Sequence, residues 1–182
     1  MTSRYDDELW ELVPADPGSP PDHLREFVRS LGRVDRALDL GCGDGRLSAE
    51  LDAAELIGAD VSGVALARAR ARLPDARLVE LDPDAPLPLK DGEFDLVLLA
   101  ETLEHARDVQ LLLSEARRVL RPGGTLAVTT PATGPLMRPP HPLSPHLRFL
   151  TGRSLARLLD ELGFEVRSLE RRAGTLLARA TR

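Results

Sequence analysis

A glycine-rich segment, residues 39–46, has the clearest potential for chemistry, and it reads Asp-Leu-Gly-Cys-Gly-Asp-Gly-Arg. Glycine permits sharp turns and lets the backbone approach a ligand closely. A dinucleotide-binding loop has the spacing G-x-G-x-x-G, whereas Gly41, Gly43 and Gly45 follow G-x-G-x-G and Arg46 stands where the third glycine would be. The segment therefore predicts either a binding loop not built for a nicotinamide dinucleotide or simply a tight strand-to-helix turn.

An acid follows this loop at a distance that suits a nucleoside ligand. Asp60 stands fifteen residues after Gly45, at the end of a short apolar run. A carboxylate in this position can accept hydrogen bonds from both hydroxyls of a ribose. A helix N-cap or a solvated strand end is the alternative. The glycine loop in front of Asp60 favours ribose binding.

A second group of chemically capable residues, Glu101, Glu104 and His105, follows another apolar run. If this stretch is a helical turn, spacings of three and four residues place Glu101 on the same face as Glu104 and His105. Two carboxylates and an imidazole can bind a divalent metal, or the histidine can act as a general base. Alternatively, the two acids only favour the start of a helix through its dipole.

Alternating short apolar runs and amphipathic stretches must position these residues. The apolar runs predict strands at 37–40, 56–60, 77–81, 94–100, 125–130, 164–169 and 175–180. The amphipathic stretches predict helices at 22–32, 47–51, 64–73, 109–120 and 155–162. Residues 65–72 alternate Ala and Arg with a period of two, but the high helix propensity of both types favours a helix.

Strand–helix alternation of this kind is typical of an α/β fold with a parallel sheet covered on both faces. Such sheets bind ligands at the carboxyl ends of their strands. The residues predicted to lie there are Asp39–Gly45, Asp60, Asp82 and Glu101–His105.

The composition sets limits on the class of protein. The chain has 182 residues, 42% hydrophobic and 29% charged, with a net charge of −5, which suits a single domain. No apolar run approaches the ~18 residues of a membrane span, and the polar N-terminus does not resemble a signal peptide. The single cysteine, Cys42, excludes an internal disulfide and a cysteine-based zinc site. We expect a soluble cytoplasmic protein with no strong general affinity for nucleic acid.

Five blocks of the sequence together resemble the motifs of class I S-adenosylmethionine-dependent methyltransferases. The blocks lie in the usual order at 38–47, 57–62, 87–97, 119–124 and 146–151, so the resemblance covers roughly residues 37–166. It implies a Rossmann-like, seven-stranded, mostly parallel sheet with helices on both faces and an antiparallel last strand. It implies S-adenosylmethionine as the cofactor.

The resemblance also assigns roles to individual residues. Asp39 and Gly41 would border the methionine moiety, Asp60 would hold the ribose, and Asp82 would approach the adenine amine. The residue after that last acid is Pro83, which lacks the N–H that often contacts the adenine ring. The implied cofactor-binding residues are Asp39, Gly41, Gly43, Gly45, Asp60, Asp82 and Glu101.

The Glu-x-x-Glu-His pattern is similar to a magnesium site in some O-methyltransferases, including enzymes of ubiquinone synthesis and enzymes that methylate the terminal ribose of small RNA. Their later histidine corresponds to His146, five residues before Thr151. The implied magnesium ligands are Glu101, Glu104, His105 and His146. Without a metal, His105 or His146 would be the catalytic base.

We therefore expect one methyltransferase domain over residues 1–182. Residues 1–21, with Tyr5 and Trp10, would form an N-terminal lid, residues 37–130 the cofactor-binding core, and residues 131–152 a substrate-lid insertion. The expected substrate is a small molecule that is methylated on oxygen. We expect the protein not to associate with membranes, and the sequence does not determine its oligomeric state. The alternatives are an RNA ribose 2′-O-methyltransferase, a non-catalytic cofactor-binding subunit and, more remotely, a nicotinamide oxidoreductase. The negative charge and the 3% aromatic content argue against RNA.

Overall fold

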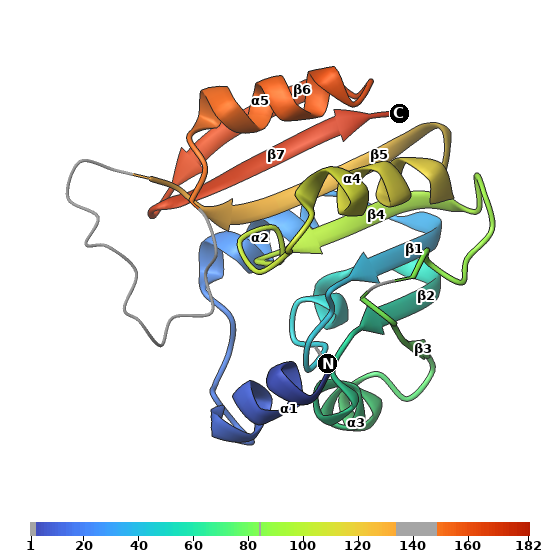
Figure 1. The fold of residues 1–182 in the computed structure, drawn as a ribbon, viewed down its shortest axis with the longest axis vertical. Helices are drawn as coiled ribbons and strands as arrows, with labels where there is room; N and C mark the ends of the chain where they lie inside the picture. The colour runs from blue at the N-terminus through green and yellow to red at the C-terminus, as the bar shows by residue number, and fades with distance from the viewer. Residues whose placement is uncertain (1–2, 84, 134–148) are drawn as a thin grey trace.

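Seven strands form one central sheet, in the order β3-β2-β1-β4-β5-β7-β6 (Figure 1). The computed structural model describes residues 3–83, 85–133 and 149–182. β7 is antiparallel to both β5 and β6, and the other neighbouring strands are parallel, so the predicted sheet is confirmed. The strands are β1 Val34–Leu40, β2 Ala53–Asp60, β3 Arg77–Glu80, β4 Phe94–Ala100, β5 Leu120–Pro131, β6 Glu165–Arg172 and β7 Thr175–Thr181.

Helices cover both faces of the sheet, as predicted. The helices are α1 Ser3–Leu12, α2 Asp22–Arg29, the short 3₁₀ helix η1 Ser48–Glu50, α3 Gly63–Arg72, α4 Val109–Val119 and α5 Gly152–Glu161. One hydrophobic cluster packs α4 and α5 on one face, and a second packs α2 on the other. The buried helix residues in these clusters are Leu24, Phe27, Val28, Val109, Leu113, Ala116, Val119, Leu155 and Leu159.

The central strand β4 illustrates why its sequence forms a buried parallel strand. Its residues Leu96 to Leu99 are each at most 1% exposed, although they alternate between the two faces. A strand covered by helices on both sides needs apolar side chains at every position. The buried carboxyl-terminal halves of β1 and β5 are covered in the same way, and they make these strands the rigid support of the residues that follow them.

The alternating Ala/Arg segment is helical, because α3 spans Gly63–Arg72. Ser62 is its N-cap, and its hydroxyl accepts a hydrogen bond from the Ala65 N–H at 3.1 Å. The high helix propensity of Ala and Arg therefore outweighs the period-two pattern of this segment. None of the helices in the described part of the chain is long and apolar enough to cross a membrane.

Three local predictions were wrong or incomplete. Residues 47–51 form only the three-residue 3₁₀ helix η1, because the chain has few residues in which to descend from the glycine loop to the start of β2. β5 begins at Leu120, directly after α4, so Pro122 lies within the strand and not in a separate loop. The helix α1 was not predicted within the N-terminal segment.

An acid of η1 binds two arginines of α2. Glu50 accepts hydrogen bonds from Arg25 Nε at 3.0 Å and Arg29 Nε at 2.5 Å. The two arginines hold the pKa of Glu50 below its usual range, against the effect of burial. The Glu50 side chain is only 15% exposed, so these ion pairs are better shielded than ordinary surface pairs.

We expect Glu50→Gln to destabilise the protein by about 1–3 kcal/mol, because it removes the charge from two charge-assisted hydrogen bonds. Urea unfolding at neutral pH measures this change. Glu161→Gln is the control, since Glu161 forms a 3.2 Å pair with Arg157 with side chains 56% and 79% exposed. The control should change stability by less than about 0.5 kcal/mol. Equal effects of the two substitutions would contradict the role given to Glu50.

Candidate active site

The glycine loop adopts backbone conformations that other residues rarely take. Gly41, Gly43 and Gly45 have φ angles of 82°, 54° and 79°. The loop is fixed to β2 at its start, because the N–H groups of Gly41 and Cys42 both donate to the Ala59 carbonyl, at 2.7 and 3.0 Å. The chain thus turns away from β1 with its backbone held beside the end of β2.

Asp60 joins this loop to the beginning of α3. Its carboxylate accepts hydrogen bonds from the Gly43 N–H at 2.8 Å and the Ser62 N–H at 2.9 Å, and the residue is 8% exposed. Burial raises the pKa of Asp60, and the backbone hydrogen bonds oppose that shift. Since Ser62 is the N-cap of α3, the N-cap alternative does not apply to Asp60. A carboxylate has about four acceptor positions, so it retains capacity for further donors.

Asp39 is more deeply buried and less fully bonded. It is 1% exposed, and its Oδ2 accepts a hydrogen bond from the Ser48 hydroxyl at 2.6 Å. Its Oδ1 is buried and has no hydrogen-bond partner among the described residues. Burial raises the pKa of Asp39 to about 7. Such an orphaned carboxylate oxygen fits a ligand that brings a donor or a positive charge.

α1 covers the glycine loop through Trp10. A Cβ added to Gly43 would lie 2.6 Å from Cζ2 of the Trp10 ring, so the indole rests directly on this glycine. The Arg68 guanidinium of α3 lies 5.9 Å from the centre of the same ring and donates to the Val13 carbonyl at 3.0 Å. Trp10 is therefore held between the loop and α3.

Two further contacts attach the N-terminal segment. Asp7 accepts hydrogen bonds from the Ser62 hydroxyl at 2.6 Å and the Val64 N–H at 3.1 Å, at the positive end of the α3 dipole. Farther along, Arg46 donates to the Gly18 carbonyl at 3.0 Å. Figure 1 shows α1 beside α3 below the sheet. The segment thus lies across the side of the site formed by the ends of β1 and β2.

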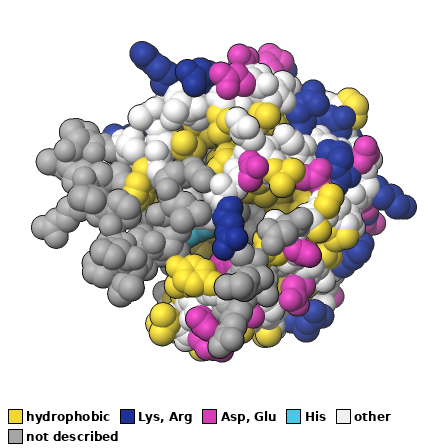
Figure 2. Space-filling model, in the orientation of Figure 1, with side chains coloured by type: hydrophobic (Ala, Val, Ile, Leu, Met, Phe, Trp, Pro, Cys, Tyr) yellow, Lys and Arg dark blue, Asp and Glu magenta, His cyan; other side chains and the backbone are white. Residues whose placement is uncertain are grey.

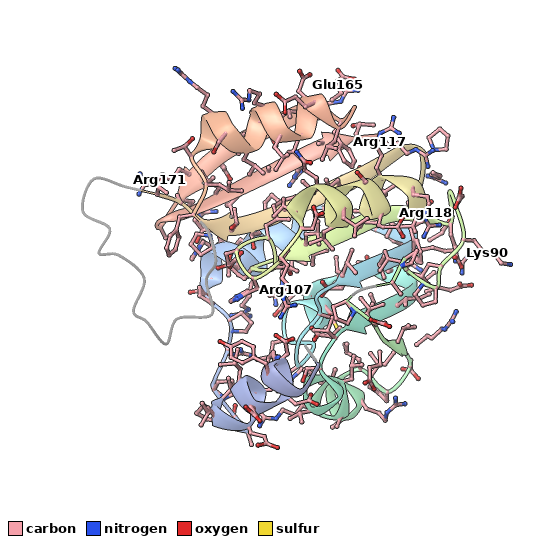
Figure 3. All side chains as sticks on the ribbon, viewed as in Figure 1. Lys90, Arg107, Arg117, Arg118, Glu165 and Arg171 are labelled. Carbon is pink, nitrogen blue, oxygen red and sulfur yellow. The ribbon has the colours of Figure 1, made fainter. Side chains whose placement is uncertain are left out.

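Asp6 and Arg107 extend this contact toward β4. Burial raises the pKa of Asp6, and the charge of Arg107 opposes the shift, so the two groups interact electrostatically. Figure 3 shows Arg107 in the loop that precedes α4, on the side nearer α1. The site is therefore bounded by α1 on one side and by the segment after β4 on the other.

The segment after β4 is a turn and not the predicted helical turn, because α4 begins only at Val109. Glu101 has a φ angle of 53°, which is rare for a residue with a side chain. The hydroxyl of Thr129 donates to the Glu101 carboxylate at 2.9 Å, and the Glu101 N–H donates to the Thr129 carbonyl at the same distance. These contacts with β5 hold Glu101 in a strained conformation, a feature that concentrates at functional sites. Burial raises its pKa.

Glu104 is bound by the next residue of β5. The Thr130 hydroxyl donates to Glu104 Oε2 at 2.9 Å, and Glu104 is 1% exposed. Its Oε1 has no hydrogen-bond partner among the described residues and lies 4.0 Å from Nε2 of His105. Burial, and to a smaller extent the charge of Glu101, raises the pKa of Glu104 to about 7.

The described residues give no support to the predicted magnesium site. Within residues 3–83, 85–133 and 149–182, no group of three or more His, Cys, Asp or Glu side chains is arranged to hold a metal ion. Thr129 and Thr130 bind one carboxylate oxygen each of Glu101 and Glu104. His146 lies outside the described residues, so its predicted catalytic and metal-binding roles remain predictions.

Asp82 is exposed and follows β3 at the same edge of the sheet. The Leu81 N–H donates to the Asp60 carbonyl at 2.8 Å, which brings this loop beside the end of β2. The Asp82 carbonyl then accepts a hydrogen bond from the Ala85 N–H at 3.2 Å and forms a turn. The structure therefore places Asp82 near the predicted site without giving it a buried position.

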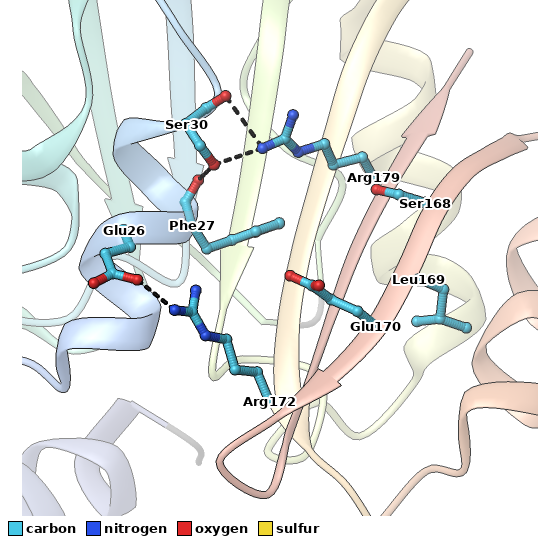
Figure 4. Close-up of a pocket in the computed structure, with 8 residues that line it drawn as sticks. All are labelled: Glu26, Phe27, Ser30, Ser168, Leu169, Glu170, Arg172 and Arg179. Atoms are coloured by element: carbon cyan, nitrogen blue, oxygen red, sulfur yellow. Dashed lines mark hydrogen bonds and ion pairs between the residues drawn. The ribbon is translucent and has the colours of Figure 1, made fainter.

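A separate hollow of about 380 Å³ lies between α2 and the β6–β7 hairpin (Figure 4). Its arginines have partners: Arg172 forms a 2.6 Å pair with Glu26, and Arg179 donates to the Ser30 carbonyl at 3.1 Å. It contains none of the residues at the carboxyl ends of β1, β2 and β4. The carboxyl-end cluster, with its buried orphaned carboxylates, is the stronger candidate for chemistry.

The hydroxyl residues Ser48, Thr129 and Thr130 and the α1 residue Asp7 were not identified from the sequence. Thr129 and Thr130 stand at the end of a predicted strand, at the same edge as the predicted acids. That position was the available signal for them. Ser48 and Asp7 carried no comparable signal, since their partners are nine and 55 residues away.

Comparisons with known proteins agree with this arrangement. A family described as "Methyltransferase domain" matches residues 38–128, half of the chain. A probable S-adenosylmethionine-dependent methyltransferase of Mycolicibacterium smegmatis is 40% identical over 137 residues, which cover 71% of this chain and 51% of that protein. Malonyl-acyl-carrier-protein O-methyltransferase of Enterobacter lignolyticus is 37% identical over 106 residues, which cover 57% of this chain and 42% of that protein. The chain spans about half the length of these relatives.

A solved structure supports the fold independently. The crystal structure of a putative methyltransferase from Bacillus halodurans superposes with a TM-score of 0.73 at 16% identity. The match covers 88% of this chain and 99% of that one. At this level of identity the likeness establishes the shared Rossmann-like architecture and leaves the chemistry to be argued from the site.

We expect Asp39→Asn to reduce the loss of stability between pH 5 and pH 8. The folded-state pKa of Asp39 is raised from 3.8 to about 7. Its stabilising contribution is therefore complete below the unfolded pKa and is lost as the pH rises through about 7. Between pH 5 and pH 8 the difference amounts to roughly 3 kcal/mol at most, because only the two units from pH 5 to the folded pKa contribute. Glu104 acts in the same direction. Urea unfolding at both pH values measures the slope, and an identical slope in the variant would refute this assignment.

Proposed function

The chain belongs to the class I S-adenosylmethionine-dependent methyltransferase family, and from this premise we propose that it transfers a methyl group to an oxygen atom of a small molecule. The observation that carries the proposal is the buried Asp39 carboxylate beside the glycine loop, one oxygen of which has no hydrogen-bond partner within the described part of the chain. A cation placed there would offset the cost of burying this acid. When bound, S-adenosylmethionine supplies an activated methyl group on a positively charged sulfur.

The residues around Asp39 suit this cofactor. Asp39 would accept a hydrogen bond from the methionine moiety, and Asp60 would hold the ribose with its remaining acceptor capacity. Gly41 and Gly43 would let the loop backbone approach the cofactor closely, and their missing side chains leave room for Thr102 and Trp10, which lie against them. Asp82 and Glu101 would complete the binding site at the adenine and methionine ends.

The acceptor would lie on the side of β4 and β5. His105 would remove the hydroxyl proton of the acceptor, or His146 would do so from the segment 131–152, most of which lies outside the described residues. The similarity to a malonyl-acyl-carrier-protein O-methyltransferase supports an oxygen acceptor. Magnesium bound with the help of His146 would be an alternative means of lowering the pKa of the hydroxyl.

RNA is a less favourable acceptor. The net charge is −5, and acidic, basic and apolar side chains are interspersed on the face shown in Figure 2. Nucleic-acid binding depends on neutralising phosphates with a concentrated basic surface. A non-catalytic cofactor-binding subunit remains the rival that experiment must separate, because it shares the whole cofactor site.

The N-terminal segment 1–21 would act as a lid over the cofactor. The contacts of Asp7 with the start of α3 and of Trp10 with Gly43 support this role. Closing a site over bound reactants excludes water and fixes their geometry, and alignment alone can supply about 7–11 kcal/mol of barrier lowering.

S-adenosylhomocysteine should bind in calorimetry, and NAD should give no heat. Asp60→Ala should weaken that binding by about 1.5–3 kcal/mol, the range for a lost hydrogen bond to a charged group. Asp52→Ala is the control, because Asp52 precedes β2 at the opposite edge of the sheet and its side chain is 62% exposed. NAD binding in place of S-adenosylhomocysteine would overturn the cofactor assignment.

An activity assay distinguishes the proposed enzyme from the alternative of a non-catalytic cofactor-binding subunit. The protein would be incubated with S-adenosylmethionine and a panel of phenols, aliphatic alcohols and carboxylic acids, and methylated products would be detected by mass spectrometry. The proposal expects products from at least one class of hydroxyl compound. Binding of S-adenosylhomocysteine with no product from any of them would favour the subunit.

The single tryptophan provides a direct test of the lid. We expect S-adenosylhomocysteine to change the acrylamide quenching of Trp10 fluorescence, because the indole rests on Gly43. Arg68→Ala should raise quenching in the free protein by releasing the ring and the Val13 carbonyl. Arg70→Ala, an exposed change on the same helix, should not. Quenching that neither the ligand nor Arg68→Ala alters would argue against a lid.

A further inference from the structure

We propose that a hollow at the end of β5 holds the body of the methyl acceptor, and that Arg171 at its rim binds an anionic group of that molecule. The acceptor is then an organic anion whose charged group is distinct from the oxygen that is methylated. This inference rests on the proposed function for the identity of the ligand. It goes further because it assigns a chemical class to the acceptor.

The hollow has a volume of about 390 Å³ and lies where three parts of the chain meet. These are the residues that follow β5, the start of α5, and the hairpin formed by β6 and β7. Its volume falls within the range of sites that bind small molecules. Its lining includes Ala132, Thr133, Gly152, Leu169, Arg171 and Leu176.

The strand register relates this hollow to the proposed acceptor side of the site. Thr130 of β5 pairs with Leu176 of β7, and Leu176 pairs with Arg171 of β6. Directly paired residues of antiparallel strands point to the same face, so Arg171 lies about 10 Å across the sheet from Thr130 on that face. The Thr130 hydroxyl donates to Glu104, in the turn after β4. A small molecule of about that length therefore suffices to reach from this turn to Arg171.

The floor of the hollow is apolar. Ala132 and Leu176 are 5% and 3% exposed, and Leu169 is half-buried. The Ala132 N–H donates to the Gly174 carbonyl at 2.8 Å, which ties the end of β5 to the hairpin. The floor therefore offers carbon atoms on a fixed backbone, and an apolar ligand body gains from being withdrawn from water there.

Gly152 leaves space beside this floor. A Cβ added to Gly152 would lie 3.5 Å from Cδ2 of Leu169 and 3.9 Å from Cδ2 of Leu176, which are ordinary contact distances. Gly152 is not among the residues with a positive φ, so its backbone conformation does not require glycine. A longer side chain at this position would extend among the lining residues and fill the hollow.

Arg171 supplies a positive charge without a partner. It is exposed, and within the described part of the chain its guanidinium forms no hydrogen bond or ion pair. The other two arginines of β6 differ, because Arg167 pairs with Glu165 and Arg172 pairs with Glu26. A guanidinium can bind a carboxylate through two parallel hydrogen bonds, so Arg171 suits an organic anion.

The acid next to Arg171 does not offset this charge within the hollow. Successive side chains of a strand point to opposite faces. Figure 4 shows the Glu170 carboxylate on the α2 side of β6, in the separate hollow described above, whereas Leu169 lies on the other side of the strand. Arg171 lies near the hairpin end of β6 (Figure 3). The hollow at the end of β5 thus combines an apolar floor with a positive charge.

Two dyes test the hollow without cofactor or turnover. The dye 8-anilinonaphthalene-1-sulfonate has an apolar aromatic body and a sulfonate, and N-phenyl-1-naphthylamine has the same body without the charge. In fluorescence titrations, Arg171→Gln should weaken binding of the sulfonate dye by about threefold to tenfold and leave binding of the uncharged dye unchanged. Gly152→Leu should weaken binding of both dyes by about tenfold or more, because the leucine side chain occupies the hollow.

Arg167→Gln is the matched control. Arg167 lies in the same strand with its side chain 55% exposed, and it does not line the hollow. Its substitution should change the binding of either dye by less than about twofold. A thermal melt checks the fold of each variant, and the exposed Arg171→Gln gives a result even if Gly152→Leu fails to fold. Equal effects of Arg171→Gln on the two dyes would overturn the anion site, and dye binding unchanged in a folded Gly152→Leu would overturn the hollow as the binding site.

Turnover then connects the hollow with the acceptor. The panel is extended with hydroxy acids, each paired with its uncharged amide. We expect a lower KM for the acid than for the amide, and Arg171→Gln should raise the KM of the acid by about threefold to tenfold. Its kcat and its affinity for S-adenosylhomocysteine should stay within about twofold of the parent, because Arg171 binds only the remote end of the acceptor.

The outcomes separate this inference from the proposed function. An unchanged KM in Arg171→Gln, or a lower KM for the amides than for the acids, would overturn the role of the hollow and leave the methyltransferase proposal intact. Failure of the parent to bind S-adenosylhomocysteine, or to methylate any hydroxyl compound, would overturn the proposed function and with it the acceptor role of the hollow. The dye titrations would still decide whether the hollow binds organic anions.

Discussion

Four carboxylates withdrawn from water at one edge of a parallel sheet are the constraint on which this molecule depends. Asp39, Asp60, Glu101 and Glu104 follow or end three strands whose carboxyl ends meet, so the topology brings like charges together. Burial raises the pKa of every one of them. Each is tolerated because a specific hydroxyl or backbone N–H donates to it, and the donors come from β5, η1 and the glycine loop itself.

These four acids differ in how completely they are hydrogen-bonded. Asp60 accepts two backbone hydrogen bonds and so fixes the loop against α3. Asp39 and Glu104 each keep one buried oxygen without a hydrogen-bond partner among the described residues. Protein interiors rarely leave such groups unpaired, and the exceptions concentrate where a ligand or a mobile proton completes the bonding. The proposed structure-stabilising and ligand-directed roles thus belong to residues of the same type at one edge of the sheet.

The sheet could be predicted from the sequence because the patterns that indicate its strands and helices are local. Short apolar runs mark the buried strands β4 and β5, and the apolar spacing of α4 alone predicts a helix. The glycine loop and Asp60 were predicted from type and position, and the structure brings them into contact. The hydroxyl partners were not predicted, because a serine or threonine becomes a carboxylate donor only through tertiary contacts. For the same reason the sequence overestimated η1 and the turn at Glu101, where connections to β2 and β5 override helix propensity.

The two N-terminal helices differ in how they are joined to the rest of the molecule. α2 contributes Leu24, Phe27 and Val28 to a hydrophobic cluster beneath the sheet, whereas α1 contributes none of the described core residues and is attached by polar and aromatic contacts. Apolar burial ties a segment to global unfolding, while a few polar contacts permit local opening at much lower free energy. Substitutions in α1 can therefore accumulate in evolution with little effect on folding, whereas selection for a stable fold continues to act on α2 and the sheet.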